Sequence, residues 1–159
     1  RIVQTVHDSK VMTRPAREAA LTVIQESACS IGIGMVESFE IDQLGMTAAN
    51  RLAMERAVYG LSCDADALLL DAFVTDLGMP QVGLIDGDAR CLSISAASIV
   101  AKVTRDRIMC ELHEVDSRYG LDRHVGYGTR MHLGALRAFG PAPFHRRSFR
   151  PVQACLIVE

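Results

Sequence analysis

Two short apolar runs decide the fold that the sequence predicts, and they read Ala67-Leu68-Leu69-Leu70-Asp71 and Gln81-Val82-Gly83-Leu84-Ile85. Each run has the length of a strand and is bounded by turn-forming residues, so each is predicted to be a buried strand. The first ends at Asp71, and the second continues through Asp86 and Gly87 to Asp88. A long helix is predicted next, over residues 93–113, with small residues near its start that would let it lie close to a sheet.

The chain before these runs predicts two helices and another strand. Thr13 can cap a helix with Pro15 in its first turn, which continues to Gln25. Residues 29–36 alternate apolar side chains with Ser or Gly, a pattern typical of a strand whose glycines allow close backbone approach on one face. A second helix is predicted to open at Glu40, with an apolar stripe at helical spacing that serves core packing. The stripe consists of Leu44, Ala48, Ala49, Leu52, Ala53 and Ala57.

After the long helix we expect a loop, a helix near residues 129–138 and an irregular Pro-rich tail. The alternation of strands and helices indicates an α/β layered domain. Three strands are few for a chain of this length, so the sheet looks incomplete at its front.

Length and composition favour one domain spanning residues 1–159. Hydrophobic residues make up 49% of the 159 residues and charged residues 23%, which disfavours disorder. No apolar run reaches the roughly 18 residues of a spanning helix. Five scattered cysteines without a CxxC pair are typical of reduced thiols in a cytoplasmic protein. The chain begins at Arg1 without a leader pattern, which suggests a fragment or a processed chain.

Charge is distributed unevenly along the chain. Residues 102–150 contain ten Lys and Arg against five Asp and Glu, a net +5, whereas the rest contains seven against fourteen, a net −7. This asymmetry suits a protein that holds a polyanionic backbone with one part and metal with the other. Ordinary solvated surface explains the same counts equally well.

Asp71 and Asp88 are the first candidates for chemistry, because each follows a predicted strand. Open α/β sheets place their sites at the carboxyl ends of strands. Two aspartates that meet there repel each other unless a cation or a proton neutralises one. Their oxygens favour Mg²⁺ or Mn²⁺ over zinc. The alternative is that both are turn-forming aspartates, which commonly follow strands.

Several other enzyme classes find no support in the sequence. It contains no GxSxG elbow, no phosphate-binding P-loop and no dinucleotide fingerprint. His124 and His132 do not have the HExxH spacing of a zinc protease.

Five blocks of sequence, taken in order, resemble the bacterial ribonuclease HII family, and the resemblance covers nearly the whole chain. Each block alone is a weak signal, but five in this order and spacing are very improbable by chance. The blocks are Asp8-Ser9-Lys10, Glu40-Ile41-Asp42, the run from Ile94 to Arg107, His124-Val125-Gly126-Tyr127-Gly128-Thr129, and His145-Arg146-Arg147-Ser148-Phe149.

The resemblance implies a ribonuclease H-like α/β fold, a mixed sheet flanked by helices, with a C-terminal helical and basic extension at about residues 115–159. It implies an endonuclease that uses two metal ions, Mn²⁺ or Mg²⁺, to hydrolyse RNA in RNA–DNA hybrids. Cleavage would fall on the 5′ side of ribonucleotides embedded in duplex DNA and leave a 3′-hydroxyl. The implied partners are the RNA–DNA hybrid duplex and ribonucleotide-containing DNA, with no membrane, and the protein would be a cytoplasmic monomer.

The resemblance assigns metal-binding and catalytic roles to Asp71 and Asp88, the third and fourth of four family carboxylates. The family usually has Gly where this chain has Ala72, and Lys where it has Asp86, which adds negative charge beside the site. The first strand, with an Asp-Glu pair and a Gly-Arg-Gly loop, should precede Asp8 but is absent from this sequence. The chain alone is therefore expected to be inactive, and the alternatives are a hybrid-duplex-binding module without catalysis or a non-functional fragment with exposed sheet edges.

Nucleic-acid contacts are also implied by the resemblance. Tyr127 matches the family tyrosine that stacks on the sugar beside the ribonucleotide, although a packed ring is the simpler interpretation. The candidates for phosphate contact are Lys10, Lys102, Arg146 and Arg147. Lys102 could instead form a plain surface pair with Asp106, four residues later on a helix. Arg105 and His145 are predicted to be structural.

Overall fold

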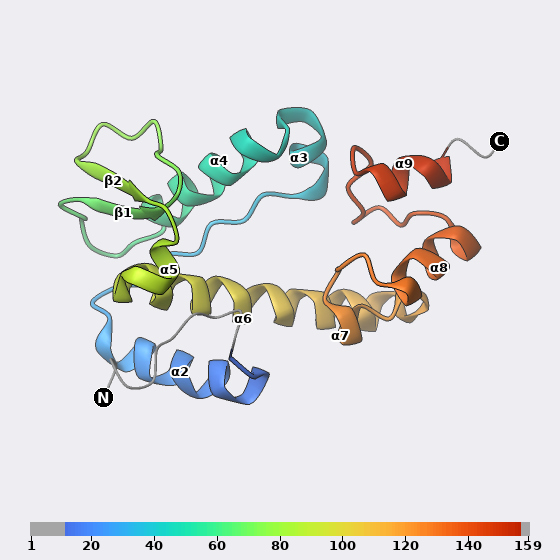
Figure 1. Cartoon of the computed structure of the whole chain (residues 1–159), viewed down its shortest axis with the longest axis horizontal. Helices are drawn as coiled ribbons and strands as arrows, with labels where there is room; N and C mark the ends of the chain where they lie inside the picture. Colours follow the sequence, from blue (N-terminus) through green and yellow to red (C-terminus); the bar gives the residue numbers. More distant parts are fainter. Residues whose placement is uncertain (1–11, 157–159) are drawn as a thin grey trace. The chain divides into compact units, whose positions relative to one another are not determined.

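The computed structural model describes residues 12–156, which form two compact units. Residues 12–35 and 50–104 form the first unit, and residues 36–49 and 105–156 form the second. None of the helices in the described range is both long and apolar enough to cross a membrane. The elements, labelled in Figure 1, are α2 (Arg14–Ser27), α3 (Ser38–Leu44), α4 (Met46–Tyr59), β1 (Leu68–Asp71), β2 (Gln81–Leu84), α5 (Gly87–Arg90), α6 (Leu92–Val115), the 3₁₀ turn η1 (Ser117–Tyr119), α7 (Leu121–His124), α8 (Arg130–Phe139) and α9 (Arg150–Leu156).

The core of the first unit joins α2 to the N-terminal half of α6, which lie side by side in Figure 1. The Thr13 hydroxyl accepts a hydrogen bond from the Ala16 N–H at 3.4 Å, and Pro15 lies in the first turn, so the predicted helix start is confirmed. Burial of apolar side chains from both helices removes them from water and stabilises the pair. These side chains are Ala20, Leu21 and Ile24 of α2 and Ile99, Val100 and Val103 of α6.

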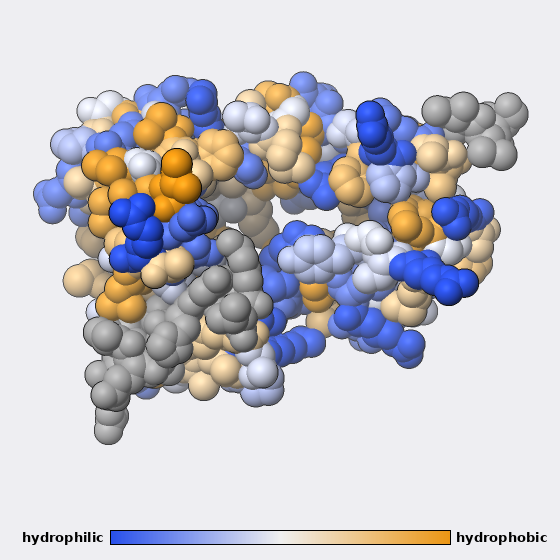
Figure 2. All heavy atoms as spheres, in the orientation of Figure 1, coloured by the Kyte–Doolittle hydropathy of each residue, from blue (hydrophilic) through white to orange (hydrophobic). Residues whose placement is uncertain are grey.

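The two predicted strands form a parallel pair, with Leu69 opposite Val82 and Asp71 opposite Leu84. The prediction that both strands are buried is wrong for most of their residues. Leu68 is buried, but Leu69 and Val82 are about half exposed. A pair of strands covered on one side leaves its other face open. Figure 2 accordingly shows hydrophobic residues gathered on the surface around these strands.

Residues 72–80, a short connection for two parallel strands, are held by the side chain of Gln81. Its Oε1 accepts hydrogen bonds from the N–H and hydroxyl of Thr75 at 2.7 and 3.0 Å. Its Nε2 donates to the carbonyl oxygens of Thr75 and Leu77 at 3.0 and 2.9 Å. One amide thereby provides hydrogen bonds to a loop that lacks regular structure, and it fixes the entry to β2.

The strand predicted over residues 29–36 is not formed, because this segment lies against α4 instead of pairing in a sheet. A Cβ built on Gly32 would lie 1.9 Å from the carbonyl oxygen of Ala57, and one on Gly34 would lie 1.9 Å from that of Ala53. The Arg56 guanidinium donates to the Met35 carbonyl at 2.6 Å. The glycines do permit close backbone approach, as predicted, but the partner is a helix.

The single helix predicted from Glu40 onward is two helices. Gly45, with φ of 78°, ends α3 and donates its N–H to the Ile41 carbonyl at 2.9 Å. Glycine adopts this left-handed backbone without steric cost. The apolar stripe is therefore divided: Ala49 is buried, whereas Leu44 on α3 is exposed.

The second unit is organised around Tyr119, which is almost completely buried. Its hydroxyl donates to the Gly140 carbonyl at 2.7 Å, and its ring meets Phe144 edge to face at 5.7 Å. Leu121, Leu136 and Val152 complete the buried cluster. Helices α7 and α8 lie beside the C-terminal end of α6, and α9 lies on the other side of α8 (Figure 1). The α/β class and the helical extension are confirmed, and the tail predicted to be irregular contains α9.

Candidate active site

Asp71 is the last residue of β1, and its carboxylate reaches the turn after β2. Its Oδ1 accepts a hydrogen bond from the backbone N–H of Gly87 at 3.0 Å. The next residue, Asp88, lies in the first turn of α5 and is 7% exposed. The structure thus brings the Asp71 side chain against the residue that precedes Asp88, at the carboxyl end of the parallel strands.

The side chains of Asp71 and Asp88 have the chemistry of ligands to a divalent ion. Carboxylate oxygens are the ligands that Mg²⁺ and Mn²⁺ prefer. Asp71 keeps acceptor capacity besides the oxygen that receives the Gly87 N–H. Across residues 12–156, no group of three or more His, Cys, Asp or Glu side chains could hold a metal ion. The donor chemistry of the two carboxylates therefore fits a hard cation.

Left-handed backbone conformations accompany the candidate residues. Among the described residues, the non-glycine positions with positive φ are Ala72 at 64°, Asp86 at 54° and Val125 at 43°. Each lies within two positions of Asp71, Asp88 or Tyr127. Such conformations cost a side-chain-bearing residue about 1 kcal/mol or more, and they concentrate at functional sites.

Replacing Ala72 with Gly is expected to raise the free energy of unfolding by about 0.5–1 kcal/mol. Glycine relieves the left-handed strain, although its greater freedom in the unfolded chain offsets part of the gain. Urea denaturation followed by circular dichroism measures the change. Ala67→Gly is the control, because Ala67 is not among the positive-φ residues. Its replacement by glycine should therefore lower the free energy of unfolding. Equal destabilisation by the two substitutions would contradict the strain at Ala72.

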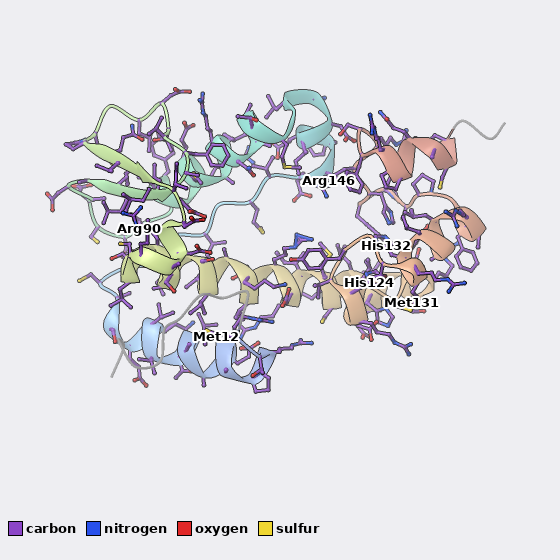
Figure 3. All side chains as sticks on the ribbon, in the orientation of Figure 1. Met12, Arg90, His124, Met131, His132 and Arg146 are labelled. Carbon is purple, nitrogen blue, oxygen red and sulfur yellow. The ribbon has the colours of Figure 1, made fainter. Side chains whose placement is uncertain are left out.

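Asp86 occupies the position where the resembled family has lysine, and its backbone explains why aspartate is accepted there. Its φ and ψ of 54° and 39° lie in the left-handed region, which Asp and Asn enter more readily than other side chains. Arg90, labelled in Figure 3, donates from its guanidinium to the Ile85 carbonyl at 3.2 Å and closes the same turn. Sequence reasoning missed this cation, which lies two residues beyond Asp88.

Tyr127 lies in a loop that is held through its backbone while its ring remains 57% exposed. The Tyr127 N–H donates to the His124 carbonyl at 2.8 Å, and the Tyr127 carbonyl accepts from the Thr129 N–H at 2.8 Å. The guanidinium of Arg105 lies over the ring at 5.5 Å and also donates to the Val125 carbonyl at 3.0 Å. The packed-ring interpretation of Tyr127 therefore does not hold.

Asp42 holds the turn that contains Arg146 and Arg147. Its carboxylate accepts hydrogen bonds from the Arg147 N–H at 2.8 Å, the Ser148 N–H at 2.8 Å and the Ser148 hydroxyl at 2.6 Å. The hydroxyl bond is the main reason that the pKa of Asp42 lies below its usual value, although burial opposes it. Sequence reasoning noted Asp42 as a landmark but missed this role.

The candidate cations differ in their surroundings. Arg146 is half-buried, with its guanidinium over the Phe149 ring at 5.1 Å, and burial lowers its pKa. The Arg147 side chain is exposed beside it, and Lys102 is half-buried on α6 in the first unit. Lys10 lies outside the described residues. The structure thus places Asp71, Asp88 and Lys102 in the first unit, and Tyr127, Arg146 and Arg147 in the second.

Comparison with known proteins places this architecture in a class. The structure resembles the crystal structure of the ribonuclease H2 from Pyrococcus horikoshii OT3 with a TM-score of 0.76 and 22% sequence identity, covering 93% of this chain and 78% of that one. At this identity the likeness concerns the fold, which is that of a ribonuclease H-type α/β protein.

The sequence comparisons identify the family. The family model described as ribonuclease HII matches residues 4–152. The ribonuclease HII of Chloroflexus aggregans is 50% identical over 152 residues, covering 95% of this chain and 72% of the relative. That of Dehalococcoides mccartyi is 46% identical over 153 residues, covering 96% and 72%. The chain belongs to the ribonuclease HII family, and membership supports ribonuclease H activity in general terms.

Proposed function

We propose that the chain carries part of the active site of an endonuclease that hydrolyses RNA in RNA–DNA hybrids, on the 5′ side of ribonucleotides embedded in duplex DNA. The observation that carries the proposal is the hydrogen bond from the Gly87 N–H to Asp71, which joins the end of β1 to the turn before Asp88. The left-handed residues beside Asp71, Asp88 and Tyr127 support the same assignment.

Asp71 and Asp88 would hold divalent ions, Mn²⁺ or Mg²⁺, at the carboxyl end of the strands. Two bound ions supply an activated water and stabilise the charge of the leaving oxygen during phosphodiester hydrolysis. The Gly87 N–H orients the Asp71 carboxylate, as outer hydrogen bonds do for many ligating groups. Burial of Asp88 fixes the second carboxylate. The negative charge of Asp86 adds to the attraction for cations.

The proposed nucleic-acid contacts come from several parts of the chain. The exposed ring of Tyr127 is suited to stack on the sugar beside the ribonucleotide. Lys10, Lys102, Arg146 and Arg147 would contact phosphates and release counterions, so binding should weaken as salt rises. A cytoplasmic monomer is part of the same proposal, and scattered cysteines without a CxxC pair are typical of reduced thiols in that compartment.

A hybrid-duplex-binding module without catalysis is the second candidate. It is favoured by one observation: the described residues provide two carboxylates and no larger metal-ligating group. The resemblance implies four carboxylates, of which this sequence contains Asp71 and Asp88. The chain by itself is therefore expected to bind hybrid duplex without cutting it.

The test compares the chain alone with a joined protein, in which the N-terminal segment of the Chloroflexus aggregans relative precedes it. Each is incubated with a duplex that contains one ribonucleotide, or with an all-DNA duplex, in Mn²⁺ or Mg²⁺. We expect the joined protein to cut the first duplex on the 5′ side of the ribonucleotide and to leave the second intact. Cutting of both duplexes at equal rates, or of neither, would contradict the proposed function.

A further inference from the structure

Three buried histidines that the proposed chemistry does not use form one cluster in the second unit. His124 and His132, labelled in Figure 3, stack with ring centroids 4.6 Å apart and planes 16° apart. The Nε2 atoms of His132 and His145 lie 3.1 Å apart. The other ring nitrogens that form hydrogen bonds contact backbone N–H or carbonyl groups. The identity of each backbone group decides whether the ring nitrogen donates or accepts.

At one end, the Nδ1 of His132 lies 3.0 Å from the Tyr127 carbonyl oxygen. A carbonyl can only accept, so Nδ1 carries the proton and Nε2 of neutral His132 is an acceptor. At the other end, the Ala142 N–H donates to Nδ1 of His145 at 3.0 Å. The Ala142 carbonyl oxygen lies 3.3 Å from the same nitrogen and accepts from the His145 backbone N–H at 3.0 Å. An amide N–H can only donate, so the shorter contact decides the role of Nδ1. Nδ1 of His145 is therefore an acceptor, and its proton lies on Nε2.

The assignments at His132 and at His145 predict the same direction for the hydrogen bond between their Nε2 atoms. Nε2–H of His145 faces the lone pair of Nε2 of His132 at 3.1 Å. The opposite assignment at either end would place two protons or two lone pairs against each other. The series of hydrogen bonds thus runs from the Ala142 N–H through His145 and His132 to the Tyr127 carbonyl. We call this series the histidine relay.

We propose that the histidine relay makes His132 and His145 positioning residues, which hold the backbone of Tyr127 so that its ring is presented to the sugar beside the ribonucleotide. This inference rests on the proposed function and assigns its recognition step to two further side chains. The relay is suited to this because Tyr127 has no burial to fix its ring, which is more than half exposed. The Tyr127 carbonyl instead receives two donors, His132 Nδ1–H and the Thr129 N–H.

The surroundings keep the relay in its neutral form. Burial is the main cause that lowers the pKa of His132 and of His145. The Nε2 of His124 lies 2.9 Å from the Tyr119 carbonyl oxygen, so this nitrogen carries a proton and donates it to that oxygen. The His124 ring stacks on the ring of His132 and fixes the plane of that ring.

An amide side chain can take the place of one ring nitrogen of a histidine at a time. Comparing Asn and Gln at the same position therefore distinguishes a lost hydrogen bond from a change in packing. Asn presents its amide near the place of Nδ1, and Gln presents it near the place of Nε2. His132→Gln should lose the donor to the Tyr127 carbonyl and reduce, by about tenfold, the preference of the chain for a duplex with one ribonucleotide over an all-DNA duplex. His132→Asn should retain most of that preference. Fluorescence anisotropy without divalent ions measures both affinities, and His113→Gln is the control because His113 faces Asp122 at 3.3 Å instead.

A double-mutant cycle tests whether the relay acts through Tyr127. In a Tyr127→Ala background, His132→Gln should change the preference by less than about twofold. An undiminished effect in that background, or equal losses from His132→Gln and His132→Asn, would overturn the proposal.

Nitrogen-15 NMR of labelled histidines in the unsubstituted chain provides a measurement that needs no variant to fold. At neutral pH it should report the proton of His132 on Nδ1 and that of His145 on Nε2. The reverse tautomers, or a charged ring at either position, would overturn the relay. If the tautomers are as assigned but the unsubstituted chain shows no preference for the ribonucleotide, then the proposed function has failed instead, and with it the purpose of the relay.

Discussion

Replacing Asp71 with Asn is expected to lower the rate at which the joined protein cuts a ribonucleotide-containing duplex by about a thousand-fold or more. An amide has no negative charge and is a poor ligand for Mn²⁺ or Mg²⁺. Metal-ion stabilisation of developing charge is worth several kcal/mol, and each 1.4 kcal/mol or so corresponds to a factor of ten in rate. The amide oxygen can still accept the Gly87 N–H, so the turn before Asp88 should persist. Single-turnover cleavage in excess Mn²⁺ measures the loss.

Asp76→Asn is the matched control for this substitution, because Asp76 is an exposed aspartate of the same unit that lies 3.9 Å from Arg51. It should leave the rate within about twofold of the unsubstituted protein. Asp88→Asn should behave like Asp71→Asn. If Asp71→Asn were to cut as fast as the control while unfolding at the same temperature, the assignment of Asp71 as a metal ligand would be wrong.

Replacing Gly34 with Ala is expected to lower the free energy of unfolding by about 3 kcal/mol or more, which is a large fraction of the total for a domain. The added Cβ would lie 1.9 Å from the carbonyl oxygen of Ala53 and 2.6 Å from the backbone nitrogen of Ala57. Both are backbone atoms of α4, so they cannot move aside as the end of a flexible side chain can. The segment 29–36 and the helix must therefore separate.

Chemical denaturation in urea measures this loss as a lower midpoint at an unchanged slope. Gly78→Ala is the control, because a Cβ at Gly78 would meet nothing within 4 Å. It should change the stability by less than about 0.5 kcal/mol. Similar midpoints for the two variants would show that the contact between Gly34 and α4 is absent in solution.

Local signals predicted much of the fold. The Thr13 cap with Pro15 in the first turn defines the start of α2, and two apolar runs of strand length became β1 and β2. The prediction for residues 29–36 failed because alternating Gly and apolar residues suit both a strand and a tight approach to a helix. Which of the two occurs depends on α4, whose small residues Ala53 and Ala57 lie far along the chain.

The candidate site was predictable where it follows from topology. Parallel strands end at the same edge, so Asp71 and the turn before Asp88 had to come close. The relay was not predictable, because each histidine is unremarkable alone and the contact between His132 and His145 depends on the fold of residues 140–145. The backbone strain at Ala72 and Val125 was likewise hidden, since neither residue type signals a left-handed conformation.

Asp42 has a consequence for how the protein is made. Its partners Arg147 and Ser148 lie 105 and 106 positions further along the chain. Ribosomes add about 5–20 residues per second, so the nascent carboxylate waits on the order of 5–20 seconds before its donors exist. Through that interval residues 36–49 cannot be joined to the arginine-bearing turn, and this part of the second unit can close only after Ser148 has been added.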